Sequence, residues 1–226
     1  MSNFNILVVT PTTVERDAVR PVLEKWIEEG KIRHEMCGVG MEQARAYCQR
    51  LENDQQDFEW MILLGYAGGL TRDLKVGDLV MAESVLAAEQ PPIACKTLSI
   101  PWISSGTILT APRLLATPQA KQVAARGGAV AVEMEAYPLA RWARQKGVNF
   151  LHTRVILDGI DERVPDVTHL LDPSGNIRIV ALIKRLSRKP TLTLDLIRFA
   201  RRVNVLRPRL EACAKTLIET IFSLRS

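Results

Sequence analysis

Apolar residues along this chain fall in short runs, and the segments between the runs carry helical spacing. Residues 5–10 (NILVVT), 60–65 (WMILLG) and 149–157 (NFLHTRVIL) are the strongest runs. Continuous apolar runs of this length are typical of strands that are buried on both faces of a sheet. Weaker extended patterns complete the predicted strands: 32–37, 76–84, 107–109 and 129–132.

Helical patterns follow most of these runs. The first has apolar residues at Val14, Ala18, Val22 and Trp26 and ends at Gly30. The predicted helices cover residues 14–29, 41–51, 118–126 and 137–146. Alternating strands and helices favour an α/β fold with a mixed, mostly parallel central sheet between two helical layers, a three-layer α/β/α architecture.

The character of the chain changes after residue 158. Residues 165–173 are predicted to be a loop, and two apolar helical faces follow, at 192–206 and 210–222, with Pro208 expected to separate them. At 226 residues, one domain over 1–226 with a basic helical extension at about 175–226 is the expected organisation.

Composition points to an ordinary globular protein, with 47% hydrophobic and 24% charged residues. No run is long enough to span a bilayer, and the N-terminus lacks the pattern of a signal peptide, so we expect a cytoplasmic protein. The four cysteines form no C-x-x-C pair and are expected to be reduced. The net charge of +5 is uneven, because ten basic residues between 178 and 209 face Asp195 alone. An anionic partner near the C-terminus would explain this asymmetry.

Common catalytic motifs are missing. Gly38-Val39-Gly40 lacks the third glycine of a dinucleotide fingerprint, the three histidines are isolated, and no Gly-x-Ser-x-Gly elbow occurs. We therefore expect no metal and no organic cofactor. What remains is a set of carboxylates just beyond predicted strands: Glu15, Glu133, Glu135 and Asp158. Ligands bind at the carboxyl ends of strands in such sheets, and buried charges need a partner or a ligand.

Four segments, taken in chain order, carry these acids or are expected to lie near them. They are ILVVTPTTVERDAV (6–19), LLGYAGGLTRDLKVGDLVMAES (63–84), AVAVEMEAYPLARWARQKGV (129–148) and FLHTRVILD (150–158). Together they resemble the nucleoside phosphorylase and nucleosidase superfamily, which includes methylthioadenosine/S-adenosylhomocysteine nucleosidases. The resemblance implies an enzyme that cleaves the N-ribosidic bond of a purine nucleoside, with adenine as the expected base.

The resemblance also implies roles for individual residues. Glu135 would accept hydrogen bonds from the ribose hydroxyls, with Met134 against the sugar and Glu133 beside it. Asp158 would act on the purine as a general acid, and Glu15 would orient an attacking water.

Tyr66, Ala67 and Gly68 would let the backbone approach the base. By rough alignment, Leu109 lies in the region 108–110, where the family places an aromatic residue against the base.

Three departures change this picture. Leu63 and Tyr66 stand where phosphorolytic members carry an arginine and a serine, so water is the more economical nucleophile, with phosphate left as an alternative co-substrate. Leu157 replaces a serine that would support Asp158. The site is therefore expected to be specialised or impaired.

Each acid also has a purely structural interpretation. The residues Thr12 and Glu15 match the sequence pattern of a capping box at the start of a helix. Glu133 and Glu135 would favour the positive end of a following helix, and Asp158 beside a glycine suits an Asx turn. Gly68 and its neighbour Gly69 suit an ordinary loop. Arg154 would pair with one of the glutamates or contact a ligand.

The resemblance further implies a homo-oligomer, a dimer first. The basic segment 178–209 resembles, more loosely, that of hopanoid-associated phosphorylase-like proteins, which are proposed to act on an adenosyl lipid. Contact with an anionic membrane surface is one interpretation, and a solvated basic face on a core helix is the other. No nucleic-acid partner is expected. The rival to an enzyme is a non-catalytic protein that binds a nucleoside or a lipid surface.

Overall fold

The computed structural model describes residues 6–54, 57–165, 172 and 190–224. Within these ranges the strands are β1 Ile6–Thr10, β2 Ile32–Met36, β3 Trp60–Gly69, β4 Leu79–Ala87, β5 Gln90–Ala94, β6 Ser104–Thr110, β7 Ala131–Glu133 and β8 Asn149–Asp158. The helices are α1 Thr13–Glu28, α2 Met41–Glu52, α3 Pro118–Ala125, α4 Ala136–Lys146 and α6 Pro190–Ser223.

The strands form one mixed sheet in the order β2-β1-β3-β7-β6-β4-β5, with β8 paired to both β3 and β4. Five pairings are parallel and three are antiparallel, so the prediction of a mixed, mostly parallel sheet is confirmed. Because β3 and β4 are also linked through β7 and β6, these strands and β8 close into a ring. The closure was not predicted from the sequence.

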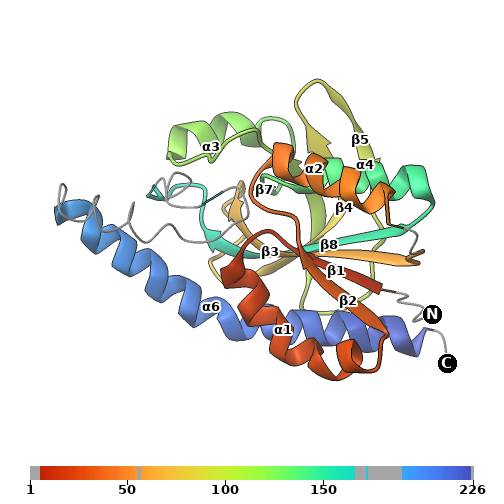
Figure 1. Ribbon diagram of the computed structural model, residues 1–226. Coiled ribbons are helices and arrows are strands. Elements are labelled where there is room, and N and C mark those ends of the chain that lie inside the picture. Colours follow the sequence, from red (N-terminus) through yellow and green to blue (C-terminus); the bar gives the residue numbers. More distant parts are fainter. Residues whose placement is uncertain (1–5, 55–56, 166–171, 173–189, 225–226) are drawn as a thin grey trace.

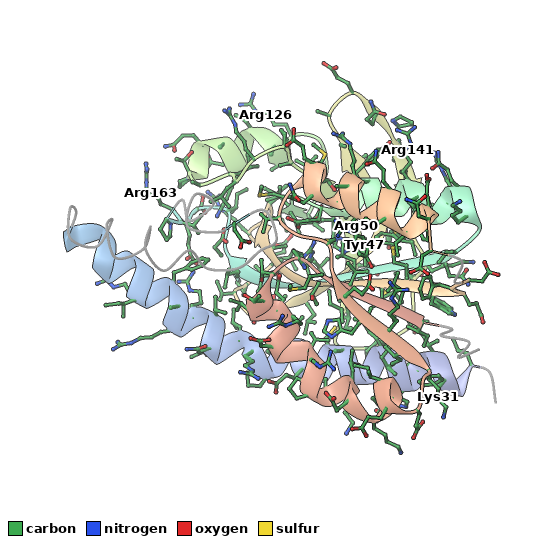
Figure 2. The ribbon with its side chains drawn as sticks, viewed as in Figure 1. Lys31, Tyr47, Arg50, Arg126, Arg141 and Arg163 are labelled. Atoms are coloured by element: carbon green, nitrogen blue, oxygen red, sulfur yellow. The ribbon has the colours of Figure 1, made fainter. Side chains whose placement is uncertain are left out.

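Helices cover the sheet on two sides (Figure 1). Alternate residues of β1 point to opposite faces, as the period of a strand requires. Ile6 and Val8 join the core under α1 and α6, whereas Leu7 and Val9 join the core under α2 and α4. Side chains fill the space on both sides of the sheet (Figure 2). The predicted three-layer architecture is thus confirmed.

Small side chains fill the inside of the ring of strands. Its core holds three alanines together with Val80, Ile108 and Ile156. A Cβ on Gly106 would lie 2.7 Å from Val130 Cγ2, so a larger residue would not fit there. A narrow ring of five strands needs small interior residues, which explains Ala131 within the Ala-Val repeat that precedes Glu133.

Two features of the sequence were misread. Strand β5 was not predicted, because Pro91 and Pro92 lie within it, yet an edge strand tolerates proline. Pro208 does not end a helix: α6 continues through it. Leu206 and Leu210 on either side are 6% and 0% exposed, and burial of this apolar face outweighs the hydrogen bond that proline removes.

The C-terminal part of α6 belongs to the core. Leu210, Cys213, Ala214, Leu217 and Ile218 have no exposed surface and pack on the same core as α1. In Figure 1 the N-terminal end of this helix projects past the other layers. Much of the basic segment expected at 178–209 lies outside the described residues. None of the described helices is both long and apolar enough to cross a membrane.

Candidate active site

The four predicted acids meet in one cavity at the carboxyl ends of the strands. Glu15, Glu133, Glu135 and Asp158 are each 5–6% exposed, and all of them line a cavity of about 170 Å³. A larger hollow of about 410 Å³ between α2 and α4 has Glu52 as its lining carboxylate, and that residue is exposed. Burial of four carboxylates beside one cavity distinguishes it as the candidate active site.

Glu15 serves its helix and the cavity at once. Its Oε2 accepts hydrogen bonds from the Thr12 backbone N–H (2.9 Å) and the Thr12 hydroxyl (2.7 Å), which completes a capping box on α1. Its Oε1 accepts from the Tyr66 backbone N–H at 2.9 Å. Burial raises the pKa of Glu15, and the charge of Arg154 opposes that rise. The structural and functional interpretations of this residue are therefore compatible.

Arg154 is the hub of the cluster. Its side chain is 1% exposed and its Nη2 donates to Glu133 Oε2 at 2.7 Å and to Glu135 Oε2 at 3.3 Å. Its Nη1 lies 3.8 Å from Glu15 Oε1. One guanidinium thus bridges three carboxylates that come from two different segments of the chain, and the expected pairing of Arg154 with a glutamate is observed three times over.

Glu133 is held by the protein on both of its oxygens. Oε1 accepts from the Thr110 hydroxyl, and Oε2 accepts from the backbone N–H groups of Glu135 and Ala136, each at 2.8 Å. Those N–H groups lie at the start of α4, so Glu133 satisfies donors that the helix leaves unpaired. Its position fits the helix-start interpretation of the sequence.

The Glu135 carboxylate lies between the start of α2 and Arg154 of β8. Oε1 accepts from the Gly40 backbone N–H at 2.8 Å, at the start of α2. Burial and the neighbouring charge of Glu133 raise the pKa of Glu135 to about 8, although Arg154 acts in the opposite direction. Burial is the larger cause of this raised pKa, and the excess negative charge of three carboxylates around one guanidinium adds to it.

Asp158 ends β8 and forms a buried ion pair with Lys121, which comes from α3. The Lys121 Nζ also donates to the backbone carbonyls of Gly159 at 2.7 Å and Glu162 at 3.0 Å. Burial raises the pKa of Asp158, and the Lys121 ammonium opposes that rise. A Cβ on Gly68 would lie 3.1 Å from Asp158 Oδ2, so this strand position suits glycine.

The remaining predicted residues divide into two groups. Met134, Tyr66, Ala67 and Gly68 line the cavity, as expected. Leu109 does not: it packs against the core that contains Leu70 and Ala111. The apolar wall comes instead from other residues, among them Leu114, Leu115, Val164 and Phe199.

Lys121 was missed because nothing in its local sequence marks it. A single lysine in a predicted helix is normally exposed, and its partner Asp158 is 37 positions away. Arg113, which also lines the cavity, was missed for the same reason. Over the described ranges, no group of three or more His, Cys, Asp or Glu side chains is arranged to hold a metal ion.

Comparison with known proteins identifies relatives of this architecture. A family model described as the phosphorylase superfamily matches residues 85–182. No curated protein matches the chain. The expected resemblance to the phosphorylase and nucleosidase superfamily is confirmed by this match and by solved structures with the same fold.

Among the solved structures is a putative 5′-methylthioadenosine/S-adenosylhomocysteine nucleosidase from Borrelia burgdorferi, bound to adenine. It is 15% identical, with 95% of this chain and 99% of that chain covered at a TM-score of 0.68. The Helicobacter pylori nucleosidase of the same kind is 18% identical over 70% of this chain and 86% of that chain, at a TM-score of 0.58. Futalosine hydrolase from the same organism is also 18% identical, over 70% of this chain and 85% of that chain, at 0.57. At these identities the likeness concerns the fold.

Proposed function

We propose that this protein cleaves the N-ribosidic bond of a purine nucleoside, with an adenine nucleoside as the first candidate. The observation that carries the proposal is the convergence of Glu15, Glu135 and Asp158 on one cavity. The shared fold with nucleosidases, including a relative bound to adenine, supports the same reaction.

The sugar would lie against Glu135 and Met134. Cleavage of the bond between the base and C1′ develops positive charge on the ribose ring, in an oxocarbenium-like transition state. A carboxylate near this charge stabilises it, and its oxygens accept hydrogen bonds from the ribose hydroxyls. Glu135 supplies this group once it has lost its proton, and Arg154 and the Gly40 N–H fix its orientation and favour its ionised form.

Asp158 and Glu15 would manage the protons. As the C1′–N9 bond breaks, its electron pair goes to the base, and protonated Asp158 donates a proton to N7. Water attacks C1′ and passes a proton to Glu15, so that water and nucleoside yield ribose and free base. The raised pKa of each carboxyl favours such exchange near neutral pH.

Water, rather than phosphate, is the nucleophile that the charges favour. Phosphorolysis needs cations that are free to bind a phosphate. Of the buried cations in the cavity wall, Arg154 is already matched by three carboxylates, and Lys121 is matched by Asp158 and two carbonyls. Additional negative charge beside Glu15 would be repelled. We therefore place hydrolysis first and phosphorolysis second.

A release assay tests this proposal. The protein is incubated with methylthioadenosine, S-adenosylhomocysteine, adenosine and inosine, with and without phosphate, and free base is followed by chromatography. Release without phosphate supports a nucleosidase, and release that requires phosphate supports a phosphorylase. If no base is released but a nucleoside raises the melting temperature, the protein is a nucleoside-binding relative and the catalytic proposal is wrong. Glu135→Gln is the matched inactive control.

Three finer points belong to the same proposal. We propose that the protein acts in the cytoplasm as a homodimer, and sedimentation of the purified chain would test the dimer.

Peripheral contact with anionic membranes is a minor proposal. Among the described basic residues of α6, Arg202 donates to Leu157 O and Arg207 to Asp17 O, so part of the positive charge serves the fold. Binding to anionic vesicles that disappears at high salt would support membrane contact, and no binding at low salt would exclude it.

A further inference from the structure

The ammonium group of Lys121 has no hydrogen left to donate. Its three N–H groups face an Asp158 oxygen, the Gly159 carbonyl and the Glu162 carbonyl. The side chain is 1% exposed, so water does not compete for these bonds. A neutral amine would leave one buried acceptor unpaired, and Lys121 is therefore held as the cation.

Other charges near Asp158 are engaged elsewhere. Arg202 of α6 donates to the Glu162 carboxylate, so these two opposite charges offset each other. Across the cavity, Arg154 is occupied by the three glutamates described above. Among the described side chains, Lys121 therefore has the largest electrostatic effect on Asp158, while Glu162 and Arg202 act on it in opposite directions.

The chain also carries Leu157 where the resemblance leads one to expect a serine beside the acid. A hydroxyl can donate to a carboxylate or accept from a carboxylic acid, so it supports both protonation states. An ammonium can only donate, and its charge stabilises the ionised state. An ammonium in place of a hydroxyl therefore changes the pH at which Asp158 loses its proton.

We propose that Lys121 is a positioning residue that fixes Asp158 through Oδ2 and favours its ionised state, so that Lys121 sets the pH range in which the base is released. This inference rests on the proposed function, in which Asp158 must be protonated to donate to the base. Because the ion pair with Lys121 favours ionised Asp158, it confines activity to lower pH than a neutral group such as a serine hydroxyl would.

The sign of the effect can be worked out. The Lys121 charge opposes the burial that raises the pKa of Asp158. Removing the charge lets this pKa rise further, so Asp158 stays protonated to higher pH. The alkaline limb of the kcat profile should therefore move upward in a variant without the charge.

The first experiment compares pH–rate profiles for base release. In Lys121→Met the alkaline limb should move up by about 1–2 pH units, the usual effect of an adjacent opposite charge. Lys121→Arg keeps the charge and should leave the limb near its wild-type position. Lys146→Met, at an exposed site on α4, controls for loss of a distant charge. A limb that stays in place or moves down in Lys121→Met would overturn the proposal.

The second experiment does not depend on activity. The Asp158 side-chain carboxyl carbon is labelled with ¹³C, assigned by its loss in Asp158→Asn, and titrated by NMR. A higher pKa in Lys121→Met than in wild type supports the proposal, and equal values overturn it. Should Lys121→Met fail to fold, Lys121→Gln takes its place, because the amide still donates to Asp158 without a charge. If wild-type protein releases no base, the proposed function fails, and the titration still decides the role of Lys121.

Discussion

A single arginine balances the acids of this site, and its removal should be costly. Arg154 is buried against Glu15, Glu133 and Glu135, whose carboxylates are themselves buried. Removing one partner of a buried ion pair leaves uncompensated charge, and here three carboxylates would lose the same counter-charge.

We expect Arg154→Met to lower the free energy of unfolding by about 3–5 kcal/mol, as for other broken buried pairs. Urea denaturation followed by circular dichroism measures it. The control is Arg72→Met, because Arg72 is 79% exposed and pairs with Asp161 at the surface. That change should leave the free energy of unfolding close to the wild-type value, because exposed ion pairs contribute little to stability. Equal losses in the two variants would contradict the view of Arg154 as the hub.

Gly65 has no room for a side chain, because the site acids and Arg154 occupy that space. A Cβ there would overlap Arg154 Nη1 and Glu15 Oε1 and would lie 3.0 Å from Glu15 Cδ. Since a displacement of about 1 Å can cost 100-fold in rate, we expect Gly65→Ala to lower kcat/KM for base release by about 100-fold. Gly127→Ala is the control, because its Cβ would lie at an ordinary 3.5 Å from the nearest atom. A Gly65→Ala variant with wild-type rates would show that Glu15 is not positioned as described.

At the scale of the element, helix α6 shows how packing overrides local sequence. Pro208 lies inside this helix, and the residues on its buried face continue without a break from Leu206 to Ile221. The helix is therefore continuous through Pro208, although it loses one backbone hydrogen bond there.

Replacing that proline should stabilise the protein. Pro208→Ala restores the N–H donor, and a gain of about 1–3 kcal/mol is expected, at or below the full cost of an interior proline. Thermal and urea unfolding measure the change. Pro118→Ala is the control, because Pro118 begins α3, where no N–H partner is needed, so no gain is expected. Destabilisation by Pro208→Ala would mean that the proline shapes a bend on which the packing depends.

For the whole molecule, the buried acids couple stability to pH. The pKa of Glu135 is raised to about 8 in the folded protein from an ordinary value of 4.5. Between these two values the folded state holds a proton that the unfolded state has released, so the folded state loses stability as pH rises. This contribution is complete below about pH 4.5 and is lost as pH approaches 8.

We therefore expect the free energy of unfolding to fall between pH 5 and pH 8 and the fall to be smaller in Glu135→Gln, which cannot ionise. Urea unfolding of both proteins at several pH values gives the difference. Comparing the two slopes isolates Glu135 from the other titrating groups. Identical slopes, or stability that rises with pH in wild type relative to the variant, would refute a raised pKa for this residue.

Local pattern determined the layers of this protein. Short apolar runs such as residues 60–65 are typical of buried strands, and the spacing from Val14 to Trp26 is typical of a helix with one buried face, so the alternation predicted the α/β class. The same reasoning placed Glu15, Glu133, Glu135 and Asp158 just beyond strands, at the end of the strand where ligands bind in such sheets.

Tertiary structure decided what that pattern does not encode. The closure of the ring depends on β8 pairing with both β3 and β4, and pairing between distant strands leaves no local trace. The partners of the acids were only partly predicted: Arg154 was expected to pair with a glutamate, whereas Lys121 has ordinary sequence surroundings and gains its role from burial. Sequence by itself therefore specified which acids face the cavity. The fold decided which of their charges are balanced, because electrostatic energy depends on distance in space and on exclusion of water.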